Sequence, residues 1–201
     1  QTNMPLVELV FQPDNPCNTN IFSSRSGDID DEPLYTVSTD FSGKNPVTFV
    51  KDALGRVLGS AEWRDSIRGD KITLGEGANA VDATGWLKKS MVPLKDTVRF
   101  EDGRGGKYKW KGNRPGLSLE LYAEDDKSQP IARFHKSRTD RTTSPPTMSP
   151  AKLVVSDRAQ TVLDMVAISF LFLEKNRRVN DRASQSRADA LGTRFGAGNI
   201  G

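Results

Sequence analysis

Residues Thr161–Leu173 read TVLDMVAISFLFL, an apolar run near the end of an otherwise polar chain. On a helical wheel its valine, isoleucine, leucine and phenylalanine side chains fall on every side, interrupted only by Asp164 and Ser169. A helix that is apolar all round must be buried, either in lipid or inside protein. With 13 residues, the run is shorter than the roughly 20 that cross a bilayer, which favours a buried core helix. The sequence therefore predicts a helix enclosed by the rest of the chain.

The remainder of the chain is patterned for strands. Between Leu6 and Phe134, short segments alternate apolar and polar residues and are separated by turn residues, which is typical of β-strands. The clearest hairpin spans Thr97–Gly112 and turns at Asp102–Gly106, where glycines supply the positive-φ positions that a hairpin needs. We expect a meander of antiparallel strands, each with one apolar and one polar face.

Length and composition are those of one domain followed by a polar tail. The chain has 201 residues, a size that single all-β domains reach. We expect one β-barrel domain over residues 1–178, with a flexible Ser/Thr/Pro-rich loop at 137–150. Residues 179–201 are polar and basic, and we expect them to be disordered or a frayed helical extension.

The predicted helix spans about residues 157–178. Lys175, Arg177 and Arg178 in its last turn are favourable at the negative end of the helix dipole. Asp164 lies within the apolar run, where a buried carboxylate needs hydrogen bonds or a cation. We expect it to point to the mouth of the barrel and to accept backbone N–H groups there.

Charge gives no support to nucleic-acid binding by the domain. The chain has 29 basic and 26 acidic residues, a net charge of +3, and the stretch from Glu174 to Gly201 accounts for this excess. The domain itself is then near neutral, so we expect no specific nucleic-acid partner. Cys17 is the single cysteine, which excludes an internal disulfide and fits a reducing compartment. The first residues do not resemble a secretory signal, so we expect a cytoplasmic protein that can act peripherally at a membrane.

Several short segments occur in an order that is characteristic of one family. They are Leu34-Tyr35-Thr36-Val37, Ala61-Glu62-Trp63, Val98-Arg99-Phe100 with Asp102-Gly103, Tyr108-Lys109-Trp110-Lys111, Ile131-Ala132-Arg133-Phe134, and Leu163-Asp164 leading through Ser169-Phe170 to Glu174-Lys175.

This series resembles an uncharacterised fungal, mainly basidiomycete, domain family of the tubby C-terminal-like superfamily. That superfamily also includes the LURP-one-related and phospholipid scramblase proteins. The resemblance covers roughly Leu6 to Arg178 and implies a closed barrel of about twelve antiparallel strands around one central hydrophobic helix. Tubby proteins bind phosphoinositides and scramblases act at membranes, but the fungal family that this chain resembles has no assigned activity, and no lipid-binding residue can be aligned to a position of this chain.

Residues with catalytic or metal-binding chemistry are sparse. His135 is the single histidine and has no carboxylate or nucleophile at a fixed spacing, so we expect it to face solvent or the barrel rim. Cys17 has no partner in a CxxC pattern. The acidic clusters Asp28–Glu32 and Glu124–Asp126 lack the ligand spacing of a calcium loop and are interpreted as solvated turns. We expect no catalytic site, no metal site and no cofactor.

The most informative candidate site is a basic strand. Lys107, Lys109 and Lys111 alternate with Tyr108 and Trp110 and therefore share one face, where their combined charge would attract an anionic headgroup or an acidic partner. The aromatic pair is expected in the core. The cations expected to contribute to this site are Lys107, Lys109, Lys111, Arg99, Arg104 and Arg114. The alternative is a basic face that serves only solubility.

We therefore expect a non-catalytic binding module that contacts anionic phospholipid headgroups, phosphoinositides in particular, through a basic outer face. The alternative is a protein-interaction or scaffold module that uses the Ser/Thr/Pro-rich loop or the basic tail. A Ser-Pro step at Ser144 in that loop could be phosphorylated and so add charge to it.

Overall fold

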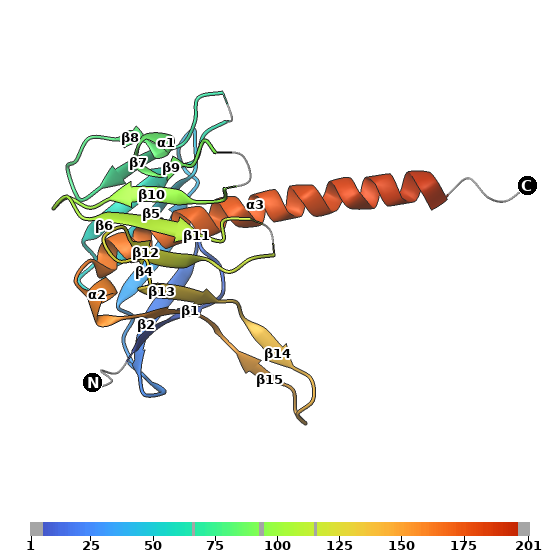
Figure 1. Cartoon of the computed structure of the whole chain (residues 1–201), viewed down its shortest axis with the longest axis horizontal. Helices are drawn as coiled ribbons and strands as arrows, with labels where there is room; N and C mark the ends of the chain where they lie inside the picture. Colours follow the sequence, from blue (N-terminus) through green and yellow to red (C-terminus); the bar gives the residue numbers. More distant parts are fainter. Residues whose placement is uncertain (1–5, 66, 93–94, 115, 197–201) are drawn as a thin grey trace, which may run out of the picture.

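The computed structural model describes residues 6–65, 67–92, 95–114 and 116–196. It shows a mainly β protein in which one large antiparallel sheet curves around the first part of a long C-terminal helix (Figure 1). Among the described residues, no helix combines the length and the apolar character needed to span a membrane.

Within the described residues, the sheet contains fourteen strands, all paired antiparallel. They are β1 (Val7–Gln12), β2 (Thr19–Arg25), β3 (Asp28–Ile29), β4 (Tyr35–Asp40), β5 (Val47–Asp52), β6 (Val57–Glu62), β7 (Lys71–Leu74), β8 (Val81–Asp82), β9 (Lys88–Lys89), β10 (Val98–Glu101), β11 (Lys107–Lys111), β12 (Glu120–Ala123), β13 (Ala132–His135) and β16 (Ala151–Val155). Their order is β8-β7-β6-β5-β4-β2-β1-β16-β13-β12-β11-β10-β9, with β3 paired to β2. The last strand thus joins the two halves of the sheet by lying between β1 and β13.

Helix α3 (Leu163–Gly196) is the centre of the core and follows the short helix α2 (Asp157–Gln160). Every residue from Val166 to Glu174 is buried, so all sides of this part of the helix are covered. This part of the helix carries apolar side chains on every side, so the hydrophobic effect favours a position in which every side is covered. The prediction of an enclosed helix is confirmed for Val166–Leu173, whereas Thr161 and Asp164 at the start of the predicted run are exposed.

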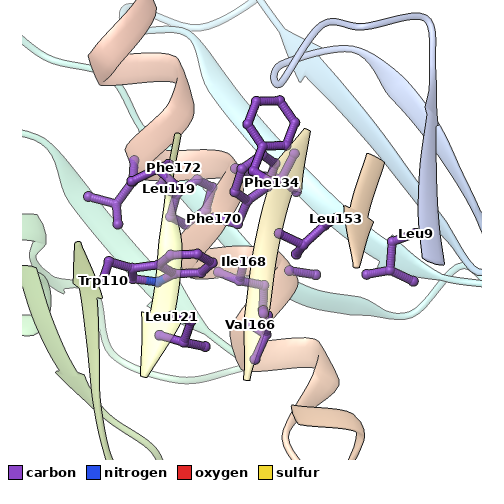
Figure 2. Packing of buried hydrophobic residues seen from close by; sticks show 14 of the residues in the cluster. Leu9, Trp110, Leu119, Leu121, Phe134, Leu153, Val166, Ile168, Phe170 and Phe172 are labelled. Carbon is purple, nitrogen blue, oxygen red and sulfur yellow. The ribbon is translucent and has the colours of Figure 1, made fainter. Parts of the chain in front are cut away.

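Strands far apart in the sheet contact this helix. The Phe170 ring lies 5.3 Å from the ring of Phe11 on β1, 4.7 Å from Phe134 on β13 and 6.0 Å from Trp110 on β11, measured between centroids. Figure 2 shows Phe170 together with Phe134 and Trp110 among the buried side chains around the helix. On the other half of the sheet, Gly59 of β6 lies against Ile168, and a Cβ added at Gly59 would lie 3.0 Å from the Ile168 Cδ1 atom. The absence of a side chain there lets the helix approach the sheet closely.

The two end strands of the sheet, β8 and β9, flank the short helix α1 (Ala83–Trp86). Helix α1 packs against β7 and β8 on one side and against β9 and β10 on the other. Within the described ranges, no hydrogen-bonded ladder joins β8 to β9. The antiparallel sheet and the central helix are therefore as predicted, whereas strand pairing does not show the closed barrel of about twelve strands.

One segment differs from the sequence-based expectation, and a second follows one of its two alternatives. Where a flexible loop is predicted at 137–150, strands β14 (Arg138–Asp140) and β15 (Thr147–Ser149) form a separate antiparallel hairpin. Helix α3 also continues past residue 178 to Gly196 and projects from the sheet (Figure 1). Extending an existing helix adds hydrogen bonds without a new nucleation cost, so a polar sequence without proline can continue it. Residues 197–201 of the predicted tail lie outside the described residues.

A buried ion network fixes α3 where it leaves the sheet. Arg177 donates hydrogen bonds to both carboxylate oxygens of Glu174, each at 2.7 Å, and Arg178 donates to the same carboxylate at 2.8 Å. Arg178 also pairs with the Asp14 carboxylate and donates to the Asp14 carbonyl at 2.9 Å. The loop between β1 and β2 is thereby tied to the helix.

Candidate functional site

The outer side of strands β10 and β11 carries the predicted basic residues. On β11, Tyr108 and Trp110 are buried, so Lys107, Lys109 and Lys111 point outward, as the alternation predicts. Val98 and Phe100 are likewise buried on β10, which places Arg99 outward.

Strand register brings these cations together. Arg99 on β10 is directly opposite Lys109 on β11, and Lys88 on β9 is directly opposite Arg99. Directly opposed residues in an antiparallel pair are about 5 Å apart, so the three side chains form a row across three strands. We call the outward cations of this region the basic face: Lys88, Arg99, Lys107, Lys109, Lys111 and Lys127.

The pKa of Lys109 reports the electrostatics of the basic face. Burial lowers this pKa, and the positive charges of Lys127, Lys111 and Arg99 lower it further, whereas Glu124 opposes the shift. The like charges are thus close enough to repel one another. An anion placed among them would relieve that repulsion.

Some cations of the basic face already have partners. Arg99 forms an ion pair with Glu124 at 2.7 Å, and the Lys111 ammonium lies 3.7 Å from the centroid of the Tyr122 ring. The Arg99 side chain is more than half exposed, and exposed pairs of this kind contribute little stability and exchange readily. The ion pair therefore leaves Arg99 able to bind a stronger anion.

A cavity of about 330 Å³ lies at the edge of the basic face. The Trp86 ring packs against Phe100 at a centroid distance of 5.7 Å, and its indole N–H donates to the Glu101 carbonyl at 3.3 Å. The volume of the cavity is at the small end of the range for sites that bind small molecules. Its lining residues are Gly85, Trp86, Lys88, Arg99, Phe100, Glu101, Lys107, Tyr108 and Glu124.

Two of the predicted cations lie away from this cluster. Arg104 is in the turn between β10 and β11, where the Asp102 carboxylate accepts the backbone N–H groups of Arg104 at 2.8 Å and Gly106 at 2.7 Å. Gly105 in the same turn has a φ of 84°, which explains its residue type. Arg114 follows the opposite end of β11. The length of β11 thus separates these two arginines, and neither lines the cavity.

Sequence reasoning missed Lys88 and Lys127. Strand β9 has two residues, too few to show a period of two, and only its pairing with β10 places Lys88 beside Arg99. Lys127 lies in the turn after β12, and its charge lowers the pKa of Lys109 because the fold brings the two side chains near each other. No local pattern points to either residue.

The single histidine and the single cysteine do not line the cavity beside the basic face. His135 is exposed at the end of β13, as expected, and Cys17 is a half-buried free thiol. In the part of the chain that the structure describes, no group of three or more His, Cys, Asp or Glu side chains is arranged to hold a metal ion.

Comparison with protein families matches residues 14–179 to a family of unknown function, DUF6593. The match includes the sheet from β2 onward, the basic face and the buried part of α3. Comparisons with curated proteins and with solved structures find no match to this chain.

Proposed function

We propose that this chain, which belongs to the DUF6593 family, is a non-catalytic module that binds anionic phospholipid headgroups, phosphoinositides in particular. The observation that carries the proposal is the row of Lys88, Arg99 and Lys109 across three strands beside a cavity of about 330 Å³. Cations that cluster on the strands of a sheet attract phosphate groups through their charge and bind them through hydrogen bonds.

The same proposal includes a tubby-like architecture. A helix surrounded by one curved antiparallel sheet supports it, and so does the position of α1 between the end strands β8 and β9. In this proposal α1 covers the seam of the barrel and presents Trp86 to the cavity. The protein would work in the cytoplasm, at the surface of a membrane.

Sedimentation with vesicles tests this function. The full chain is mixed with neutral phosphatidylcholine vesicles and with vesicles that also contain a phosphoinositide, at low and at physiological salt. We expect binding to the second kind alone, weakened by salt because screening shortens the range of surface charges. Equal recovery with both kinds of vesicle would contradict the proposal.

Charge reversal locates the binding surface. Each basic residue near an anionic membrane contributes about 1 kcal/mol, so K107E/K109E is expected to weaken vesicle binding at least about tenfold. The control K44E/K136E changes net charge by the same amount at two exposed lysines outside the basic face. Equal losses in both double variants would show attraction by net charge instead of binding at a site.

The hairpin β14–β15 favours a second candidate function, a contact with a protein partner. All six of its strand residues are exposed, Met148 included, and the hairpin extends away from the sheet (Figure 1). Deleting residues 138–149 should then abolish capture of the partner while vesicle binding remains. A pull-down that survives the deletion argues against this alternative.

A further inference from the structure

A second cationic cavity lies where α3 leaves the sheet, away from the basic face. It has a volume of about 330 Å³ and lies between the β1–β2 loop and α3. Lys175, Arg178 and Arg182 follow one another at helical spacings of three and four residues, so they line the same side of α3. The complete lining is Asp14, Asn15, Pro16, Cys17, Lys175, Arg178, Val179 and Arg182.

Lys175 is held in place without a direct ion pair to any described residue. Its ammonium lies 3.7 Å from the centroid of the Trp63 ring and donates only a long, 3.4 Å hydrogen bond to Asn176. The Trp63 indole N–H donates to Thr48 Oγ1 at 2.7 Å, and the Trp63 ring packs edge-on against Phe172. Burial lowers the pKa of Lys175. The charge of Asp70 opposes this shift. In the described ranges Lys175 forms no ion pair, so its partly desolvated charge has no anion in direct contact.

The opposite wall of the cavity is also fixed. Arg178 pairs with Asp14 and Glu174, and the Ser137 hydroxyl donates to the second Asp14 carboxylate oxygen at 2.7 Å. Arg178 thereby holds the β1–β2 loop in position instead of offering its guanidinium to a ligand. Arg182, one turn further along α3, is exposed and has no ion pair within the described part of the chain. The guanidinium N–H groups of Arg182 are therefore available to a ligand.

The charges at the cavity define the ligand that would neutralise it. Three cations line the cavity and Asp14 is its one lining carboxylate, which leaves two positive charges. A phosphate monoester carries about −2 at neutral pH and offers three strong acceptor oxygens. An arginine can bind such a group through two parallel hydrogen bonds from its planar guanidinium, and a lysine can bind it through the compact charge of its ammonium.

We propose that this cavity binds a phosphate monoester group between the Lys175 ammonium and the Arg182 guanidinium. The inference is independent of the function proposed above, because the cavity shares no residue with the basic face. The phosphate could belong to a soluble molecule or to a lipid headgroup, and the two sources are distinguished by experiment.

Calorimetric titration of the full chain with sn-glycerol 3-phosphate tests the soluble source. We expect saturable binding with a Kd below about 1 mM, and at least a tenfold weaker Kd in K175M/R182Q. The methionine of K175M keeps an apolar side chain over the Trp63 ring, and R182Q changes an exposed position. Neither substitution should therefore prevent folding. If K175M nevertheless fails to fold, R182E alone is expected to abolish binding. The matched control K107M/K109M should bind as the wild type does.

Vesicles of phosphatidylcholine with phosphatidic acid, a lipid phosphate monoester, test the second source. Binding to these vesicles that K175M/R182Q loses, without binding of the soluble ester, assigns the cavity to a lipid. The proposal is overturned if neither probe binds, if sodium chloride at equal ionic strength gives the same heat, or if K175M/R182Q binds both probes as tightly as the wild type. Loss in K107E/K109E alone would instead identify the basic face.

Discussion

Arg177 and Glu174 form a bidentate ion pair in which both side chains are 1% exposed. Glu174 directly follows the apolar part of α3, which ends at Leu173, and Arg177 lies one turn further along the helix. Two charges can be buried at this depth only because each completes the other's hydrogen bonds. Arg178 and Asp14 extend the network to the β1–β2 loop.

Removing one partner of this pair should be strongly destabilising. We expect Arg177→Met to lower the free energy of unfolding by about 3–5 kcal/mol, because Glu174 would remain buried with part of its charge uncompensated. Urea denaturation followed by circular dichroism measures the change. The control is Arg133→Met. The Arg133 side chain is more than half exposed and its partner Glu120 is half-buried, so the cost should be about 0–1 kcal/mol. Similar losses for both variants would contradict the structure.

Gly59 should tolerate no side chain. A Cβ at this position would meet Ile168 Cδ1 at 3.0 Å and the backbone oxygen of Thr73 at 3.3 Å. We expect Gly59→Ala to cost about 1–3 kcal/mol, as overpacking of a filled core does. For comparison, Gly43→Ala would place its Cβ 3.7 Å from its nearest neighbour, the Asn45 carbonyl, and should be near neutral. A stable Gly59→Ala protein would show that α3 lies further from β6.

The buried hydrogen bond between Trp110 and Ser169 gives a third prediction. The indole N–H donates to Ser169 Oγ at 3.0 Å, and both residues are fully buried. Ser169→Ala leaves this donor without its acceptor, and we expect a loss of about 1–3 kcal/mol. Ser42→Ala removes an exposed hydroxyl that contacts Asp40 and serves as the control. If Ser169→Ala costs no more than Ser42→Ala, the Trp110 N–H must face another acceptor.

Tyr35 should resist ionisation. Burial, then the hydrogen bond and charge of Asp164 and the charge of Asp52, raise the pKa of Tyr35 well above its usual range. Because the folded pKa is raised, this contribution to stability is complete below the unfolded pKa of about 10 and declines as the pH rises above it. In Tyr35→Phe, the fall in unfolding free energy above about pH 10 should be shallower. The tyrosinate absorbance near that pH should be the same in both proteins, and a loss of signal in the variant would contradict the burial of Tyr35.

How far the sequence predicts this fold depends on the range of the interactions. The all-round apolar character of Thr161–Leu173 predicts burial because hydrophobicity is local information. Alternation likewise places Lys107 and Lys109 on the face opposite Trp110, as observed. Lys88 and Lys127 join them only through strand pairing and a turn, which a single sequence does not reveal.

The sequence predicts another role for the cations that follow the apolar part of α3, and the difference has a physical reason. Lys175, Arg177 and Arg178 fit the role of exposed cations at a negative helix end, yet Arg177 is buried and Lys175 is half-buried. The i,i+3 spacing of Glu174 and Arg177 permits their pair, but its burial depends on the loop that carries Leu117, whose carbonyl accepts from Arg177 at 3.4 Å. Asp164 likewise accepts the Tyr35 hydroxyl at 2.6 Å, in place of the backbone N–H groups expected from sequence.

Hydrogen exchange along α3 tests most directly the claim that the sheet encloses this helix. The amides from Val166 to Glu174 should exchange only when the whole domain unfolds, at the rate set by the global free energy of unfolding. Those from Asn180 to Arg187 project beyond the sheet and should exchange through local fraying, orders of magnitude faster. Equal protection of the two segments, or fast exchange at Val166–Glu174, would contradict an enclosed helix.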